Sequence, residues 1–317
     1  MRRVLGIENL SPPPNGCAVA IGTFDGVHLG HRALIDAAKR RAEREGLASA
    51  ILTWDRHPNE TVHPDRIPPL LTSTERRIEL LSEQGADLLA VLEFNRELSS
   101  WSPERFVKEV LANGLSTRVV TIGEGWRFGR GAAGTVELLE ELGSDLGFEV
   151  EVVPLQVVDG EPVSSSRVRS IVASGDMQGA EKLLQRPFDV EGVVVHGDDR
   201  GAGLGFPTAN VALHPLLASP ARGVYAGRAR ADEKWHTAAI NVGVNPTFGG
   251  DPSSMPMRIE AFLLDFSGGL YDETIRIEFH ERLRDEERFP SADALVEQMK
   301  LDVEATRRVI ESRRDSC

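Results

Sequence analysis

The sequence predicts two domains of different classes: an α/β domain with a doubly wound parallel sheet, and a small antiparallel β-barrel with a terminal helix. Three observations support this division. The chain has 317 residues. A domain with a single core usually has ~100 to 200 residues, so this length predicts two domains. Apolar runs alternate with helical patterns as far as Arg186. From Pro187 onward, short β-like runs follow one another between Gly, Pro and Asp turns. We therefore expect domains at residues 1–186 and 187–317.

Composition limits the classes of partner. The chain is 41% hydrophobic and 27% charged, as globular proteins are. Its 49 acidic and 36 basic residues give a formal charge of −13, which repels nucleic acids and anionic membranes. No apolar run approaches the ~20 residues that span a bilayer. We expect no nucleic acid or membrane partner, and a cytoplasmic location, because the two cysteines allow at most one bridge and the N-terminus lacks a signal-peptide core.

The first domain alternates strand-like and helical segments. The strand-like runs are CAVAIG, ASAILTW, ADLLAVLEF, RVVTIG and EVEVVPL. Helices are expected at about 28–45 and 102–113, the second capped by Ser102 with Pro103 in its first turn. Two short helices then follow, one after the serines of SSSRVRSIVASGD and one at about 177–185. This alternation predicts right-handed crossovers, helices on both faces of the sheet, and a ligand site beyond the carboxyl ends of its strands.

The second domain consists of β-like runs and a terminal helix. The runs are DVEGVVVHG, GVYAGRARA, HTAAINVG, RIEAFLLDF and TIRIEFHERL, whose close spacing predicts an antiparallel barrel. The last segment begins with a serine cap at Ser291 and repeats apolar residues at helical spacing. These residues are Leu295, Met299, Val303 and Val309. We expect this amphipathic helix to lie against the barrel.

The stretch GTFDGVHLGH, residues 22–31, joins the first of these strands to a helix. A strand that enters a helix through a Gly-rich turn directs backbone N–H groups and the positive helix end at one place, which favours an anion. His28 and His31 are three residues apart and share a helix face, which we expect to meet solvent, while Gly30 leaves room for a phosphate. An isolated histidine is more often a cap or a half-buried ring. Here spacing, glycines and strand together favour phosphate binding.

This stretch resembles the motif of the HxGH nucleotidyltransferases and, more narrowly, the first signature of bacterial bifunctional riboflavin kinase/FAD synthetases. The resemblance implies that ATP adenylylates FMN with release of pyrophosphate, and that the FMN phosphate itself is the nucleophile. Positioning and charge neutralisation would then supply the catalysis. The resemblance assigns catalytic roles to His28 and His31. It assigns the ATP site of this domain to Gly22, Phe24, Asp25, His28, Gly30 and His31.

Two further stretches of the first domain match the same family. VSSSRVR resembles a serine-rich motif that holds triphosphate oxygens, although alone it is more often a helix cap. It adds Ser164, Ser165, Ser166 and Arg169 to the ATP site. IGEGWRFGRGAAG resembles the flavin-side loop and would otherwise be an ordinary surface loop. It assigns the flavin contact to Arg127, Phe128 and Gly129.

The first domain also departs from the family pattern at three positions. Thr23 replaces a common asparagine, Arg56 replaces a proline, and Gly125 replaces an acidic residue or asparagine. These differences leave open a second interpretation, in which an HxGH transferase uses CTP or another acceptor and carries a riboflavin kinase or flavin-binding barrel. A third interpretation is a flavin-binding protein without turnover.

HGDDRGAGLGFPTANV, residues 196–211, is the principal motif of the second domain. Its glycines allow the backbone to wrap a polyphosphate, and Thr208 and Asn210 offer neutral oxygen ligands of the kind that Mg²⁺ accepts. Spacing alone fits a turn before an Asx-capped strand equally well. Resemblance to the riboflavin kinase signature favours Mg²⁺ and ATP at Thr208 and Asn210. It assigns the shape of the ATP loop to Gly201, Gly203 and Gly205.

RIEAFLLDF resembles the family strand that carries the catalytic glutamate, which falls here on Glu260. A carboxylate there would accept the ribityl 5′-hydroxyl proton as that oxygen attacks the γ-phosphorus of ATP. From pattern alone, Glu260 is an outward-facing residue on an alternating strand. The whole resemblance implies riboflavin, FMN and ATP as partners, with Mg²⁺ as cofactor and ATP as co-substrate. The sequence leaves open whether the chain forms a homo-oligomer.

Overall fold

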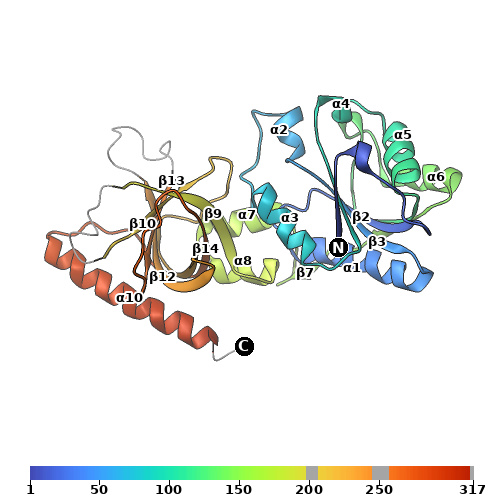
Figure 1. Ribbon diagram of the computed structural model, residues 1–317. Helices are drawn as coiled ribbons and strands as arrows, with labels where there is room; N and C mark the ends of the chain where they lie inside the picture. The colour runs from blue at the N-terminus through green and yellow to red at the C-terminus, as the bar shows by residue number, and fades with distance from the viewer. Residues whose placement is uncertain (198–205, 245–256, 315–317) are drawn as a thin grey trace. The chain divides into compact units, whose positions relative to one another are not determined.

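The computed structural model describes residues 1–197, 206–244 and 257–314 (Figure 1). The chain divides into two compact units, one of Met1–Leu70 with Thr74–Ser165 and one of Leu71–Ser73 with Ser166–Cys317. This division places α8 (Met177–Leu184), and all of α7 (Ser165–Ser174) after its first residue, with the second unit. The expected boundary at Arg186 remains a prediction.

A six-stranded parallel sheet forms the centre of the first unit. Its order is β1-β4-β3-β2-β5-β6, and every neighbouring pair is parallel, which confirms the predicted class. The strands are β1 (Arg2–Leu5), β2 (Cys17–Ile21), β3 (Ala48–Trp54), β4 (Leu88–Leu92), β5 (Thr117–Gly123) and β6 (Glu149–Val153). Strand order reverses between β2 and β5, and in such sheets that crevice is where ligands bind.

Helices cover both faces of this sheet because side chains alternate along β2. Cys17, Val19 and Ile21 belong to the apolar cluster that includes the segment after α5, whereas Ala18 and Ala20 face α1. The small alanines leave room for that helix. The helices are α1 (Leu29–Glu45), α2 (Pro58–Val62), α3 (Thr74–Ser82), α4 (Arg96–Ser99), α5 (Pro103–Phe106), η2 (Val107–Gly114) and α6 (Val136–Leu146), with short turns η1 (Ile7–Asn9) and η3 (Arg130–Ala132) and a small hairpin of β7 (Val157–Val158) and β8 (Glu161–Pro162).

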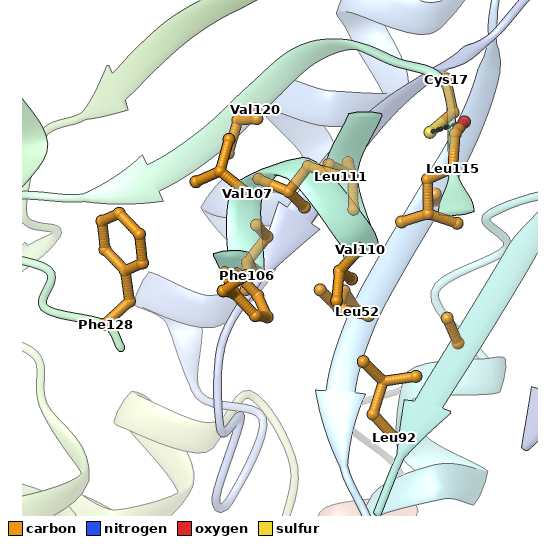
Figure 2. Packing of buried hydrophobic residues seen from close by; sticks show 14 of the residues in the cluster. Cys17, Leu52, Leu92, Phe106, Val107, Val110, Leu111, Leu115, Val120 and Phe128 are labelled. Atoms are coloured by element: carbon orange, nitrogen blue, oxygen red, sulfur yellow. Dashed lines mark hydrogen bonds between the residues drawn. The ribbon is translucent and has the colours of Figure 1, made fainter. Parts of the chain in front are cut away.

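The helix expected at 102–113 begins as predicted and then changes its winding. Ser102 Oγ accepts a hydrogen bond from the Arg105 N–H at 3.3 Å and caps α5, but η2 continues as a π-helix. Figure 2 shows side chains from both segments packed against the sheet. They are Phe106, Val107, Val110 and Leu111, against Leu52, Leu92 and Val120. Wider π turns occur frequently beside functional sites.

The second unit contains a closed antiparallel barrel with strand order β10-β13-β12-β11-β14-β9. Its strands are β9 (Phe188–Val195), β10 (Ala209–Leu213), β11 (Gly223–Ala231), β12 (Lys234–Val244), β13 (Met257–Leu263) and β14 (Thr274–Arg284). Along β13, Ile259 and Ala261 are fully buried, while Arg258 and Glu260 are half-buried. Because strand side chains alternate, the apolar residues fill the interior and the polar ones lie outside.

The terminal helix α10 (Ala292–Arg314) packs against β11, β12 and β14, as predicted. Ser291 Oγ accepts from the Ala294 N–H at 3.2 Å. Arg284 donates to both carboxylate oxygens of Asp302, at 2.9 and 2.7 Å, and so fixes the helix to β14. Within the described ranges, no helix is both long and apolar enough to cross a bilayer.

The thiol of Cys17 is fully buried and donates to the Leu115 carbonyl at 3.5 Å (Figure 2). Burial raises its pKa to about 12, from a reference value of 9.0. Since the unfolded chain ionises first, the thiol stabilises the fold below about pH 9 and loses this contribution as pH rises toward 12.

We therefore expect Cys17→Ala to have a flatter alkaline stability profile than its parent. Both proteins carry Cys317→Ser, so that Cys17 is the only cysteine that differs between them. Above pH 9, the free energy of unfolding of the parent should fall by up to about 1.4 kcal/mol per pH unit more than that of Cys17→Ala. Thermal unfolding from pH 8 to 11 measures this difference. Parallel profiles for the two proteins would contradict the assignment.

Candidate active sites

The first candidate site lies where β2 leads into α1. His28 caps the helix, and its Nδ1 accepts a hydrogen bond from the His31 N–H at 3.4 Å. The two imidazole rings stack with centroids 3.6 Å apart and an interplanar angle of 18°. The predicted common face is therefore confirmed. The expected solvent-facing position is wrong for His28, which is 5% exposed and has its ring stacked against that of His31.

Packing holds the loop before His28 in an uncommon backbone conformation. Phe24 and Val27 have φ of 54° and 43°, and both side chains are fully buried in the core beside α1 and α3. Positive φ is rare for any side chain and rarest for a β-branched one, so the surrounding contacts must fix it. The Phe24 ring meets His31 edge-on at 5.3 Å. The core therefore sets the orientation of the histidine stack.

The other predicted ATP-site residues of the first unit surround this stack. A Cβ at Gly30 would lie 3.2 Å from His28 Cε1, and one at Gly22 would lie 3.1 Å from the Phe24 ring. Ser165 Oγ donates to the carbonyl of Asp25 at 3.0 Å, which joins the serine-rich segment to the loop.

The remaining members of the serine-rich motif are less closely placed. Ser164 is exposed, while Ser166 and Arg169 lie on α7 and belong to the second unit. Their part in the ATP site remains a prediction.

Arg77, on α3, is a neighbour of this loop that the sequence did not indicate. It is 1% exposed and donates from Nη2 to the Trp54 carbonyl at 2.8 Å, at the end of β3. Burial lowers the pKa of its guanidinium, against the field of nearby carboxylates led by Asp25. One buried cation thus acts on both the loop and the end of β3. The segment TERRIELL, which contains Arg77, has the pattern of an ordinary charged helix face, so the sequence alone does not indicate a buried arginine here.

An aromatic pocket of about 350 Å³ opens beyond the carboxyl ends of β2, β3 and β5. Trp126 and Phe128 stack on its wall with ring centroids 4.7 Å apart. It is lined by Thr23, Trp54, Pro58, Asn59, Val62, His63, Phe94, Leu98, Ser99, Phe106, Trp126, Arg127, Phe128, Gly129, Gly131 and Ala132. The predicted flavin residues lie together here, whereas Trp54, Phe94 and Phe106 come from three segments that no motif singled out.

Two departures from the family pattern have local explanations. Arg56 forms an ion pair with Asp55 at 2.8 Å and is absent from the pocket lining. Burial raises the pKa of Asp55, but hydrogen bonds from Arg56 and the Phe94 N–H outweigh it and hold that pKa below its usual value. Gly125 has a φ of 71°, which glycine adopts without strain.

The second candidate site lies on the outer face of the barrel. In strand register, Asn210 of β10 and Asn241 of β12 both lie opposite Glu260 of β13. Thr208 is half-buried directly before β10. The structure therefore brings together Asn210 and Glu260, as the motif assignments require. The predicted loop glycines Gly201, Gly203 and Gly205 lie outside the described residues.

Arg258 completes this group. Its Nε donates to Asn210 Oδ1 at 2.8 Å and lies 3.2 Å from Glu260 Oε1, and its Nη2 also donates to Asn210 Oδ1. A Cβ at Gly197 would lie 2.6 Å from Arg258 Nη2 and still closer to Asn210 Nδ2. No sequence motif indicated Arg258, although its position two residues before Glu260 places both side chains on one face of β13.

Comparisons with known proteins cover both units. A family model described as FAD synthetase matches residues 10–167, and one described as riboflavin kinase matches residues 184–310. A bifunctional riboflavin kinase/FMN adenylyltransferase from Pseudomonas fluorescens is 37% identical, over 97% of each chain. The protein of that name from Bacillus subtilis is 35% identical, over 90% of this chain and 89% of its own. A crystal structure described as a macrolide-efflux protein from Streptococcus pneumoniae has a TM-score of 0.84 at 29% identity, covering 97% of this chain and 99% of that one.

We expect Gly197→Ala to disturb the second site, because the added methyl group would overlap Asn210 and Arg258. Overpacking of this kind lowers the free energy of unfolding by about 1–3 kcal/mol. Calorimetric unfolding of the full chain measures this loss of stability. Gly269→Ala is the control, since no atom lies within 4 Å of a Cβ there. Equal stability of the two variants would contradict the close packing at Gly197.

Proposed function

The chain belongs to the family of bifunctional riboflavin kinase/FMN adenylyltransferases, and we propose that it phosphorylates riboflavin to FMN and then adenylylates FMN to FAD. The barrel would carry the first reaction and the α/β unit the second. Both use ATP, and the second releases pyrophosphate.

One observation carries the adenylylation half: a single loop borders both the aromatic pocket and the histidine stack. Thr23 lines the pocket, and the next residue, Phe24, touches His31. A flat isoalloxazine ring fits a pocket walled by stacked aromatic side chains. The phosphate of a flavin held there would lie near the helix end, where an ATP α-phosphate is also favoured.

The histidines are suited to donate hydrogen bonds to phosphate oxygens. Because His28 Nδ1 accepts the His31 N–H, neutral His28 carries its proton on Nε2 and donates from there. Stacking holds both rings rigidly, and buried Phe24 supports His31. Negative charge that builds on the α-phosphate oxygens during adenylyl transfer would be stabilised by preorganised hydrogen-bond donors rather than by water that must reorient. No enzyme nucleophile is needed.

In the barrel, Glu260 is proposed as the general base. Its half-buried carboxylate lies on the outer barrel face, where it would accept the 5′-hydroxyl proton of riboflavin. Asn210 and Thr208 would hold Mg²⁺ with ATP. Their neutral oxygens fit this ion, and the paired donors on Asn210 Oδ1 indicate an oxygen that already attracts positive charge. The ion would neutralise phosphate charge.

Incubation of the purified chain with riboflavin and MgATP, followed by chromatography, tests both reactions. We expect FMN and then FAD. Glu260→Gln should lower FMN formation 10²- to 10⁴-fold, as loss of a general base does, while FAD formation from added FMN persists. Formation of a flavin–cytosine dinucleotide when CTP replaces ATP, or of FMN without FAD when ATP is present, would refute the adenylylation half. No FMN would refute the kinase half.

Gly30→Ala should impair FAD formation selectively. The methyl group would press on His28 at 3.2 Å and shift the stack by a few tenths of an ångström, and small misplacements of donors cost on the order of tenfold in rate. FMN formation by the same variant is an internal control, and Arg40→Ala, on the exposed side of α1, is an external one. Equal loss of both activities would contradict a local effect.

A further inference from the structure

Arg258 lies between the two side chains that define the barrel site. Two of its nitrogens donate to Asn210 Oδ1, and its Nε lies 3.2 Å from a Glu260 oxygen. Asn210 is 6% exposed, so this amide has little access to water. One guanidinium therefore satisfies a buried amide oxygen and neutralises a half-buried carboxylate at the same time.

The same amide oxygen is the one that the family motif assigns to a divalent metal. An amide oxygen has two lone pairs, and the two Arg258 donors already engage it. The guanidinium carries a positive charge, so it repels a dication brought to its acceptor. Arginine and metal thus compete for one oxygen.

We propose that Arg258 is a counter-cation which takes the metal's place at Asn210 and beside Glu260, and that binding of the metal–nucleotide complex displaces it from the Asn210 oxygen. The inference rests on the proposed kinase function. Arg258 is then a positioning residue: it orders the amide and the carboxylate before nucleotide arrives, and it sets the metal concentration that the site requires.

Binding of Mn²⁺ in the presence of ADP tests this without turnover, because paramagnetic resonance counts the free ion. Arg258→Met keeps the length of the side chain and removes the charge. We expect it to bind Mn²⁺ on the order of tenfold more tightly than the parent, since a competing charge is gone. The Mg²⁺ concentration for half-maximal FMN formation should fall by a similar factor. Arg230→Met, which removes a charge paired with exposed Glu233, is the control.

Two further variants separate charge from packing. Arg258→Lys retains the charge and should bind Mn²⁺ like the parent. If Arg258→Met does not fold, Arg258→Gln replaces it, because glutamine can still donate to Asn210 but carries no charge and should also tighten binding. Unchanged or weaker binding in the uncharged variant, or equal tightening in Arg258→Lys, would overturn the proposal. Failure of the parent to make FMN would refute the kinase function instead, and the Mn²⁺ titration would still decide the competition.

Discussion

Alternation of side chains along two strands, β2 and β13, is the constraint on which both sites depend. On β2, Ala18 and Ala20 face α1, so the helix can approach the sheet and its first turn meets the crevice. On β13, Ile259 and Ala261 occupy the barrel interior. The polar side chains of that strand, Arg258 and Glu260, therefore lie on the outer face. In each case a buried apolar set decides where the polar set must lie.

Under the proposed function, the two candidate sites would attract phosphate by different means, although the chain as a whole has a formal charge of −13. The first relies on a helix end, a rigid histidine stack and a buried guanidinium at Arg77. The second offers a half-buried arginine, Arg258, held between an amide and a carboxylate, and the metal ion that would displace it from the amide. Neither needs a broad basic surface, because partial charges and single cations act over a few ångströms where water is excluded. Net charge therefore says little about either site.

Prediction from the sequence was most accurate for features that lie within one continuous segment of the chain. The strands from β2 to β6, five of the six barrel strands and the terminal helix follow from periodicity, and the His28–His31 face follows from spacing. The sixth barrel strand, β10, was not among the expected β-like runs. Prediction was least accurate where several segments converge. β1 has only one buried residue to mark it, and Trp54, Phe94 and Phe106 reach the pocket from β3, a loop and α5. Their association depends on how the chain crosses the sheet, which no local pattern contains.

The π-helical winding of η2 has a consequence for how this unit tolerates change. Each residue of an α-helix turns the chain by about 100°, and a π-helix turns it by less. The winding of η2 therefore determines the angle around the helix axis between Phe106, on the pocket wall, and Val110 and Leu111, in the core. Deleting a single residue there would restore ordinary winding but rotate one set away from its partners. An insertion or deletion in this stretch would therefore disturb both the pocket wall and the core, whereas a point substitution would disturb only one of them.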